Sequence, residues 1–142
     1  MKIDINELQV GDIVWEPYGG YRLVHEIKSQ FDIRLIGLHW GIPGSFDPSE
    51  VQYAHIDMNL LQSLGFDTFN LTGQKPYAII NIERNIYLRA FSMTSQTLPL
   101  VDLKENDTIL MLPEINYMHQ IQRLYTDLTK RKLTIIKKDE NS

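Results

Sequence analysis

Histidine is the side chain of this sequence best suited to bind a transition metal. The four histidines, His25, His39, His55 and His119, are separated by 14, 16 and 64 residues. None of them has a second histidine at the short helical or hairpin spacing that usually builds a metal site. We therefore interpret all four as surface or packing residues and expect no bound metal.

Carboxylates are the next candidates, because clustered acidic groups bind divalent cations. Four of them, Asp102, Glu105, Asp107 and Glu114, lie within a short segment of the chain. However, the Leu-Lys-Glu-Asn-Asp sequence at residues 103–107 is typical of a solvated turn. We favour the turn over an acidic metal or catalytic cluster.

Motifs for covalent catalysis and for phosphate binding are absent from the sequence. Ser45, Ser92 and Ser95 lack the Gly-x-Ser-x-Gly context of a nucleophile elbow. Neither Gly-Lys-Ser nor Gly-Lys-Thr occurs, and the chain has no cysteine to act as a thiol nucleophile. We expect no cofactor and favour a protein that is not an enzyme, with an enzyme of dispersed catalytic residues as a further alternative.

Charge is distributed unevenly along the chain. Residues 1–122 carry 8 basic and 15 acidic groups, whereas residues 123–142 carry 6 basic and 3 acidic groups. Because affinity for duplex nucleic acid comes chiefly from clustered Lys and Arg, the acidic body is expected not to bind it. The alternative is a nucleic-acid-associated accessory protein, in which the N-terminal sheet or the basic tail contacts phosphates. The tail is basic at Lys130, Arg131, Lys132, Lys137 and Lys138.

No segment has the features of a membrane or export signal. Apolar runs stay well short of the roughly 18 to 20 residues of a spanning helix. The start, Met1-Lys2-Ile3-Asp4, lacks the apolar stretch of a secretory signal. We expect a cytoplasmic protein with no membrane partner.

Aromatic residues are concentrated in the N-terminal half, at Trp15, Tyr18, Tyr21, Trp40 and Phe46. Two or three of these rings, projecting from loops, would form a shallow surface of the kind that binds peptides. The strand pattern around Trp15 favours core packing for that residue. Trp40 stands in a loop rich in Gly and Pro, so we predict that it is exposed and contacts a partner.

Residues 1–56 are predicted to form a small barrel-like antiparallel sheet. Short apolar runs at 13–15, 21–28 and 32–39 alternate with turn residues and indicate strands. At 47–50, Asp-Pro-Ser-Glu has a capping Asp, Pro at the first helical position and Glu three residues after the cap. This pattern predicts a single helical turn.

Residues 57–142 are predicted to form an α+β subdomain, which makes the whole chain α+β. Asp57, the helical spacing of the apolar residues after it and Gly65 indicate a short helix. A second antiparallel sheet and a long C-terminal helix should follow. Its expected strands are 77–83, 86–92 and 108–112, the helix is 115–129, and a terminal edge strand contains Leu133, Ile135 and Ile136.

The C-terminal helix should bury one face and expose the other. At about 100° per residue, the apolar residues fall on one side: Met118, Ile121, Leu124, Tyr125 and Leu128. His119, Gln122, Arg123 and Thr126 then lie opposite. We predict that His119, Gln122 and Arg123 bind a partner, which is a protein target or a second copy of the chain. A plain solvent face remains an equal alternative.

The helix also carries a resemblance. Residues 115–125 read Ile-Asn-Tyr-Met-His-Gln-Ile-Gln-Arg-Leu-Tyr, followed by Leu128-Thr129. This resembles the C-terminal Tyr-x-His-Gln-x-Gln-x-Leu-Tyr motif of an uncharacterised family of small proteins from gut bacteria and their prophages or mobile elements. An opening Glu-Leu-x-Val-Gly-Asp-x-Val (Glu7 to Val14) and a central Leu-Leu-x-x-Leu-Gly-Phe (Leu60 to Phe66) are also similar.

The resemblance covers about a quarter of the chain and departs from the family at Lys130, where the family has Gly. It implies an architecture and a genomic setting, and it implies no chemistry. Together with the missing catalytic motifs, it leads us to expect a non-enzymatic interaction or regulatory protein of a phage or mobile element.

Overall fold

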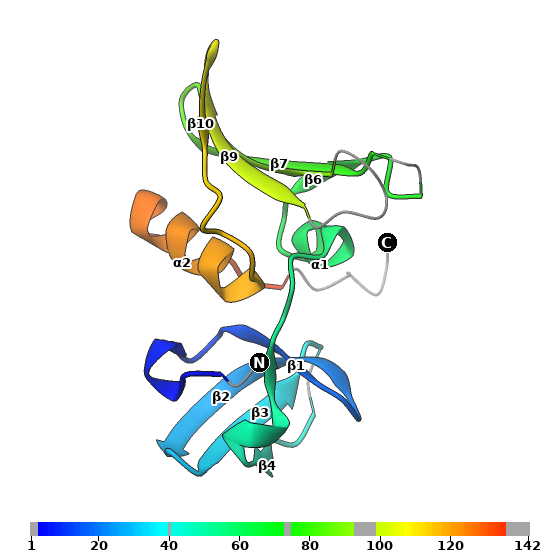
Figure 1. Ribbon diagram of the computed structural model, residues 1–142, viewed down its shortest axis with the longest axis vertical. Helices are drawn as coiled ribbons and strands as arrows, with labels where there is room; N and C mark the ends of the chain where they lie inside the picture. Colours follow the sequence, from blue (N-terminus) through cyan, green and yellow to red (C-terminus); the bar gives the residue numbers. More distant parts are fainter. Residues whose placement is uncertain (1–2, 40, 73–74, 93–98, 136–142) are drawn as a thin grey trace. The chain divides into compact units, whose positions relative to one another are not determined.

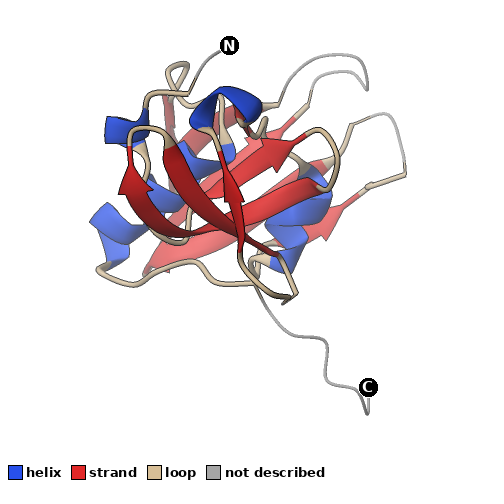
Figure 2. Cartoon of the chain, turned by 90° about the horizontal axis from the view of Figure 1, so that it is seen from below, coloured by secondary structure: helices blue, strands red, loops and turns tan. Residues whose placement is uncertain are grey.

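The computed structural model describes residues 3–39, 41–72, 75–92 and 99–135 (Figure 1). The chain divides into two compact units, Met1–Ala54 with Tyr117–His119, and His55–Asn116 with Gln120–Ser142. Each unit contains one five-stranded antiparallel sheet, and more of the chain is strand than helix (Figure 2). The predicted α+β class is therefore confirmed.

The first unit is a meander of four strands to which a fifth strand returns. Its elements in chain order are η1 (Ile5–Glu7), β1 (Ile13–Glu16), β2 (Gly20–Ser29), β3 (Asp32–Gly37), β4 (Gly44–Phe46), η2 (Pro48–Glu50) and β5 (Gln52–Tyr53). The strand order is β4-β3-β2-β1-β5, with all neighbours antiparallel.

The predicted helical turn at 47–50 is present and starts the return. The Asp47 carboxylate accepts the Ser49 N–H at 2.9 Å, and the Glu50 side chain accepts the Asp47 N–H at 3.3 Å. Pro48 needs no partner for its nitrogen at the first helical position. After this capped turn the chain pairs with β1, where Tyr53 lies opposite Val14.

The first sheet remains open, so the barrel-like closure expected for it is wrong. Among the described residues, β4 pairs only with β3 and β5 pairs only with β1, which makes both of them edge strands. The outer sides of these three- and two-residue strands therefore stay as separate sheet edges instead of pairing with each other. The predicted antiparallel sheet of short strands is present.

A hydrophobic cluster of the first unit lies on one face of its sheet. Its buried residues are Leu8, Val14, Val24, Ile33, Leu35 and Val51. Partly buried residues, among them Phe46 and Tyr53, pack against this cluster. The Tyr53 hydroxyl also accepts the Asp4 N–H at 2.7 Å and donates to the Glu7 carboxylate at 3.0 Å, which fixes η1 against β5.

The second unit is a five-stranded meander with helices. Its elements are α1 (Met58–Ser63), β6 (Asp67–Phe69), β7 (Tyr77–Glu83), β8 (Ile86–Phe91), β9 (Leu100–Glu105), β10 (Thr108–Met111) and α2 (Met118–Thr129), whose first two residues group with the first unit. The order is β10-β9-β8-β7-β6. Figure 1 shows α1 and α2 on the same side of this sheet. Within the described chain, no helix is long and apolar enough to cross a membrane.

The turn between β7 and β8 falls at Arg84-Asn85, as predicted. Arg84 has a φ of 47°, which is the left-handed region that normally favours glycine. The Asn81 side chain donates hydrogen bonds to the Arg84 and Ile86 carbonyls at 2.9 and 3.3 Å. These bonds hold a turn that lacks the usual glycine.

The C-terminal part differs from the expectation in three places. β9 runs through Lys104 and Glu105, so the turn expected at 103–107 is confined to Asn106-Asp107. α2 begins at Met118 instead of residue 115. Residues 132–135 form no strand, so the predicted edge strand is wrong there, and Ile136 lies outside the described residues.

Candidate functional site

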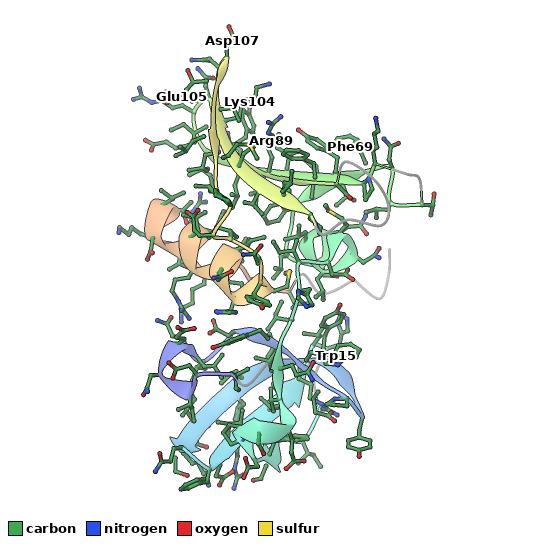
Figure 3. All side chains as sticks on the ribbon, in the orientation of Figure 1. Trp15, Phe69, Arg89, Lys104, Glu105 and Asp107 are labelled. Carbon is green, nitrogen blue, oxygen red and sulfur yellow. The ribbon has the colours of Figure 1, made fainter. Side chains whose placement is uncertain are left out.

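Three aromatic residues lie in or beside the turn between β1 and β2. Trp15 and Tyr21 are cross-strand partners whose ring centroids lie 5.0 Å apart in an edge-to-face arrangement. Tyr18, in the turn itself, is 96% exposed, and Trp15 is 36% exposed. We call Trp15, Tyr18 and Tyr21 the aromatic cluster; Figure 3 labels Trp15, which lies on β1.

The exposure of Trp15 overturns the expectation that it packs in the core. Successive residues of a strand point to opposite faces. Val14 and Glu16 are 0% and 1% exposed and occupy the core face. Trp15 therefore points the other way, beside Tyr21 on β2 and Gln52 on β5.

A buried carboxylate holds the turn that carries the cluster. The Glu16 side chain accepts the Tyr18 N–H at 2.6 Å and Arg22 Nε at 3.0 Å. Burial alone would raise the pKa of Glu16, but hydrogen bonds from the Tyr18 N–H, Arg22 and the Gly19 N–H outweigh it and lower that pKa. The ionised Glu16 thus fixes both ends of the turn.

Arg22, the basic partner of Glu16, is held in place by a neighbouring ring. The Arg22 guanidinium lies over the Phe46 ring, 5.5 Å from its centroid. A Cβ added at Gly19 would overlap this guanidinium, so a larger residue there would displace the Arg22 side chain. Phe46, which the sequence grouped with the surface aromatics, instead packs against the core.

The predicted partner residues of the C-terminal helix are not on an exposed face. His119 is 2% and Gln122 7% exposed, and Arg123 is half-buried. The exposure expected for them is therefore wrong. Leu128, expected to be buried, is 42% exposed. A role toward a partner stays a prediction for His119, Gln122 and Arg123, while Trp40 lies outside the described residues.

The burial of His119 has a local cause. The Met118 N–H donates to the Ala54 carbonyl at 2.8 Å, which brings the start of α2 against β5. There the imidazole of His119 stacks on the Tyr53 ring, with centroids 4.7 Å apart and planes 23° apart. Tyr117 contacts the same ring at 5.1 Å. The family-like residues at this point thus serve packing within the first unit.

A second charged pair lies on the face of the second sheet opposite the buried Leu88 and Val101. Arg89 binds the Asp102 carboxylate through two hydrogen bonds of 2.8 and 2.6 Å. Asp102 is only 1% exposed, so its assignment to a solvated turn is wrong. The hydrogen bonds to Asp102 raise the pKa of Arg89 above its usual range, and the bond to Tyr77 adds to this.

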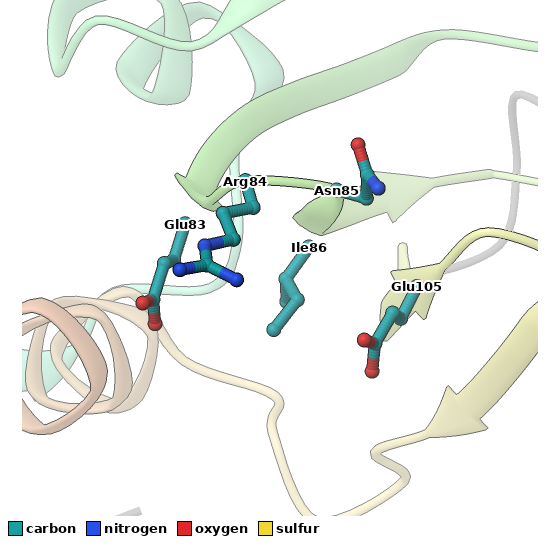
Figure 4. A pocket seen from close by; sticks show the side chains of 5 residues that line it. All are labelled: Glu83, Arg84, Asn85, Ile86 and Glu105. Atoms are coloured by element: carbon teal, nitrogen blue, oxygen red, sulfur yellow. The ribbon is translucent and has the colours of Figure 1, made fainter.

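The second unit has a hollow on its surface. It has a volume of about 320 Å³ and lies at the turn between β7 and β8. Figure 4 shows the side chains that line it, which are Glu83, Arg84, Asn85, Ile86 and Glu105. In the described part of the chain, no three His, Cys, Asp or Glu side chains come together in a way that could hold a metal ion.

Comparison of the chain with family models, curated proteins and solved structures gave no match. Function is therefore argued from the site itself. Of the arrangements described above, the aromatic cluster is the one that presents large rings to solvent on a fixed backbone. Sequence reasoning found its rings and missed Glu16, although an acidic residue directly after an apolar strand and before a Pro-Tyr-Gly-Gly turn is a usable signal for a turn anchor.

Proposed function

We propose that the protein is a non-enzymatic interaction protein of the cytoplasm that binds an extended segment of a protein partner on the aromatic cluster. The observation that carries the proposal is the exposure of Trp15 and Tyr18 on a turn anchored by a buried, ionised Glu16. The family resemblance adds the setting of a phage or mobile element.

The chemistry of the cluster suits such a segment. Tyr and Trp are enriched at the centres of protein interfaces because they bury a large area for the loss of few rotatable bonds. Exposed aromatic rings are the kind of side chain on which extended or proline-rich peptides dock. Glu16 and Arg22 neutralise each other, so the surface offers rings instead of net charge.

The fixed backbone of the turn supports a binding role for the exposed rings. A loop that orders only when it binds loses free energy, since its side chains and backbone must be fixed at that moment. Here the backbone of Tyr18 is already held at 2.6 Å by a carboxylate that is 1% exposed. The cluster is thus pre-organised.

Panning a displayed library of random peptides against the purified full chain tests the proposal. Peptides enriched on the wild-type protein should bind at least about ten-fold more weakly to Trp15→Ala and Tyr18→Ala, as expected for aromatic hot spots. Phe31→Ala is the matched control, because Phe31 is a 69% exposed ring in the turn between β2 and β3. That variant should bind as the wild type does.

Two results would contradict the proposal. One is a library that yields no enriched peptide on the folded wild-type chain. The other is a set of peptides whose affinity falls with Phe31→Ala and is unchanged by Trp15→Ala and Tyr18→Ala.

A further inference from the structure

The strand at the open edge of the second sheet is apolar and exposed. Thr108–Met111 form β10, which pairs with β9 and with no other strand in the described chain. All four side chains are exposed, and Ile109, Leu110 and Met111 reach 51%, 57% and 45%. Figure 3 shows Asp107 at the tip of the β9–β10 hairpin.

This edge lacks the charges, proline and bulges that usually protect an edge strand. Natural edges are blunted by charges, proline, bulges or short length, because unpaired backbone groups recruit another strand. β10 has no charged residue and no proline, and its register with β9 is regular. The opposite edge, β6, has three residues and starts with Asp67, and the edge strands of the first sheet have three and two residues.

The backbone groups that face the open edge can be identified. The Leu112 N–H donates to the Val101 carbonyl at 2.9 Å. In an antiparallel ladder, alternate residues direct their N–H and C=O groups to the same side. Leu110 and Thr108 therefore face β9, whereas Ile109 and Met111 direct their backbone groups outward.

We propose that β10 pairs antiparallel with β10 of a second copy of this chain, about a two-fold axis that passes at Leu110. In this register Ile109 of each copy exchanges two hydrogen bonds with Met111 of the other copy, which makes four bonds in all. The two Leu110 side chains lie opposite each other. The two sheets then continue as one.

The symmetry of the segment favours a second copy over a strand of another protein. Asp107, in the hairpin turn, and Pro113, which lacks an N–H, bound the stretch that can pair. Both lie three residues from Leu110, so the stretch is centred on that residue. A copy rotated by 180° therefore meets it over its full length, apolar against apolar, with no charge set against an apolar side chain.

The contact is small, so the dimer should be weak. Stable complexes bury roughly 800 Å² on each partner, and one short strand edge buries less. We expect association at roughly micromolar concentrations and above. Sedimentation velocity of the full chain from about 5 to about 500 µM should show a sedimentation coefficient that rises with concentration.

Leu110→Lys should abolish that rise, because two like charges would lie directly opposite across the axis. Leu128→Lys is the matched control, since Leu128 is a leucine with 42% exposure on α2. It should sediment as the wild type does. Unchanged melting temperatures, within a few degrees, would show that both variants fold.

The register can be tested directly because the natural chain has no cysteine. Residues directly opposite in a non-hydrogen-bonded pair have Cα atoms about 4.5 Å apart, within the range a disulfide spans. Leu110→Cys should therefore form a covalent dimer under mild oxidation far faster than Leu128→Cys. A chain that stays monomeric throughout overturns the pairing and leaves the edge to a foreign strand. Dimerisation that survives Leu110→Lys, or equal cross-linking of the two cysteine variants, also overturns it.

Discussion

Glu16 is the residue on which the proposed binding surface depends most. Its carboxylate accepts hydrogen bonds from a backbone N–H and from Arg22, while its own exposure is 1%. Hydrogen bonds to a charged group contribute more than neutral ones, typically about 1.5 to 3 kcal/mol each. A single substitution there should loosen the turn without touching the rings.

We therefore expect Glu16→Gln to lower the free energy of unfolding at pH 7 by about 1 to 3 kcal/mol. The pKa of Glu16 is lowered from its ordinary value of 4.5 in the folded protein. The carboxylate's stabilising contribution is thus fully present above that ordinary value and is lost as the pH falls through the folded pKa. Urea unfolding of both proteins at several pH values measures the difference, which should shrink on acidification. A difference that does not change with pH would show that ionised Glu16 is not the anchor.

Arg89 and Asp102 form a second buried ion pair, and removing one of the two residues should destabilise the folded protein. Removing one member of a buried pair typically costs about 3 to 5 kcal/mol, because the remaining charge is left without compensation. Arg89→Met should therefore destabilise the protein more than the double variant Arg89→Met, Asp102→Leu. Chemical denaturation of the single and double variants measures this. Equal losses in the two variants would contradict it.

Sequence reasoning at this scale identified residue types better than their surroundings. The N-terminal aromatics were singled out, but Trp15, expected in the core, is 36% exposed. A shift of one residue along a strand exchanges its buried and exposed faces. When every residue of a short run is apolar, as at 13–15, the sequence does not show which residues point to the core. His119 and Gln122 were wrongly predicted to be exposed. Helical angles show which residues share a face, but they do not show how many faces of the helix other parts of the chain cover.

At the scale of elements, local chemistry was the best guide. The capped turn at 47–50 and the hairpin at Arg84-Asn85 were both predicted, since each is fixed by side chains a few residues apart. β9 was missed because a buried Asp102, paired with Arg89 from another strand, looks polar in the sequence. The edge strand expected after α2 depended on a short apolar run alone.

The left-handed residue of that hairpin leads to a prediction of increased stability. Arg84 has a φ of 47°, a conformation that costs a side-chain-bearing residue about 1 kcal/mol. Arg84→Gly should raise the free energy of unfolding by roughly 0.5 kcal/mol after glycine's entropy in the unfolded chain is counted. Arg84→Ala is the control, since it removes the same side chain and keeps the strain. If thermal unfolding shows the two variants equally stable, the turn is not strained.

At the scale of the whole molecule, the α+β class followed from periodicity and turn chemistry. The open first sheet did not, because closure depends on pairing between distant edges that no local pattern specifies. The same holds for the aromatic cluster: its rings are local, whereas the fixed turn beneath them depends on burial of Glu16 in a folded sheet.

The acidic body has a consequence for the alternative of a nucleic-acid-associated protein. We expect no appreciable binding of duplex DNA at about 0.15 M salt, because residues 1–122 carry 15 acidic and 8 basic groups and their net negative charge repels phosphates. Fluorescence anisotropy of a labelled duplex measures it, with truncation after Thr129 as the control for weak retention by the basic tail at low salt. Sub-micromolar binding at the higher salt would favour the alternative.

Trp15 lies at the centre of the proposed partner-binding surface, so its indole signal reports binding there most directly. The chain has two tryptophans and therefore gives two indole N–H signals in a nitrogen-15 NMR spectrum. A Trp15→Phe variant assigns them. Titration with a peptide selected on the wild-type chain should shift the Trp15 indole signal in step with saturation, while the backbone signal of Phe31 stays in place. A bound peptide that leaves the Trp15 signal unmoved would show that the protein binds its partner elsewhere.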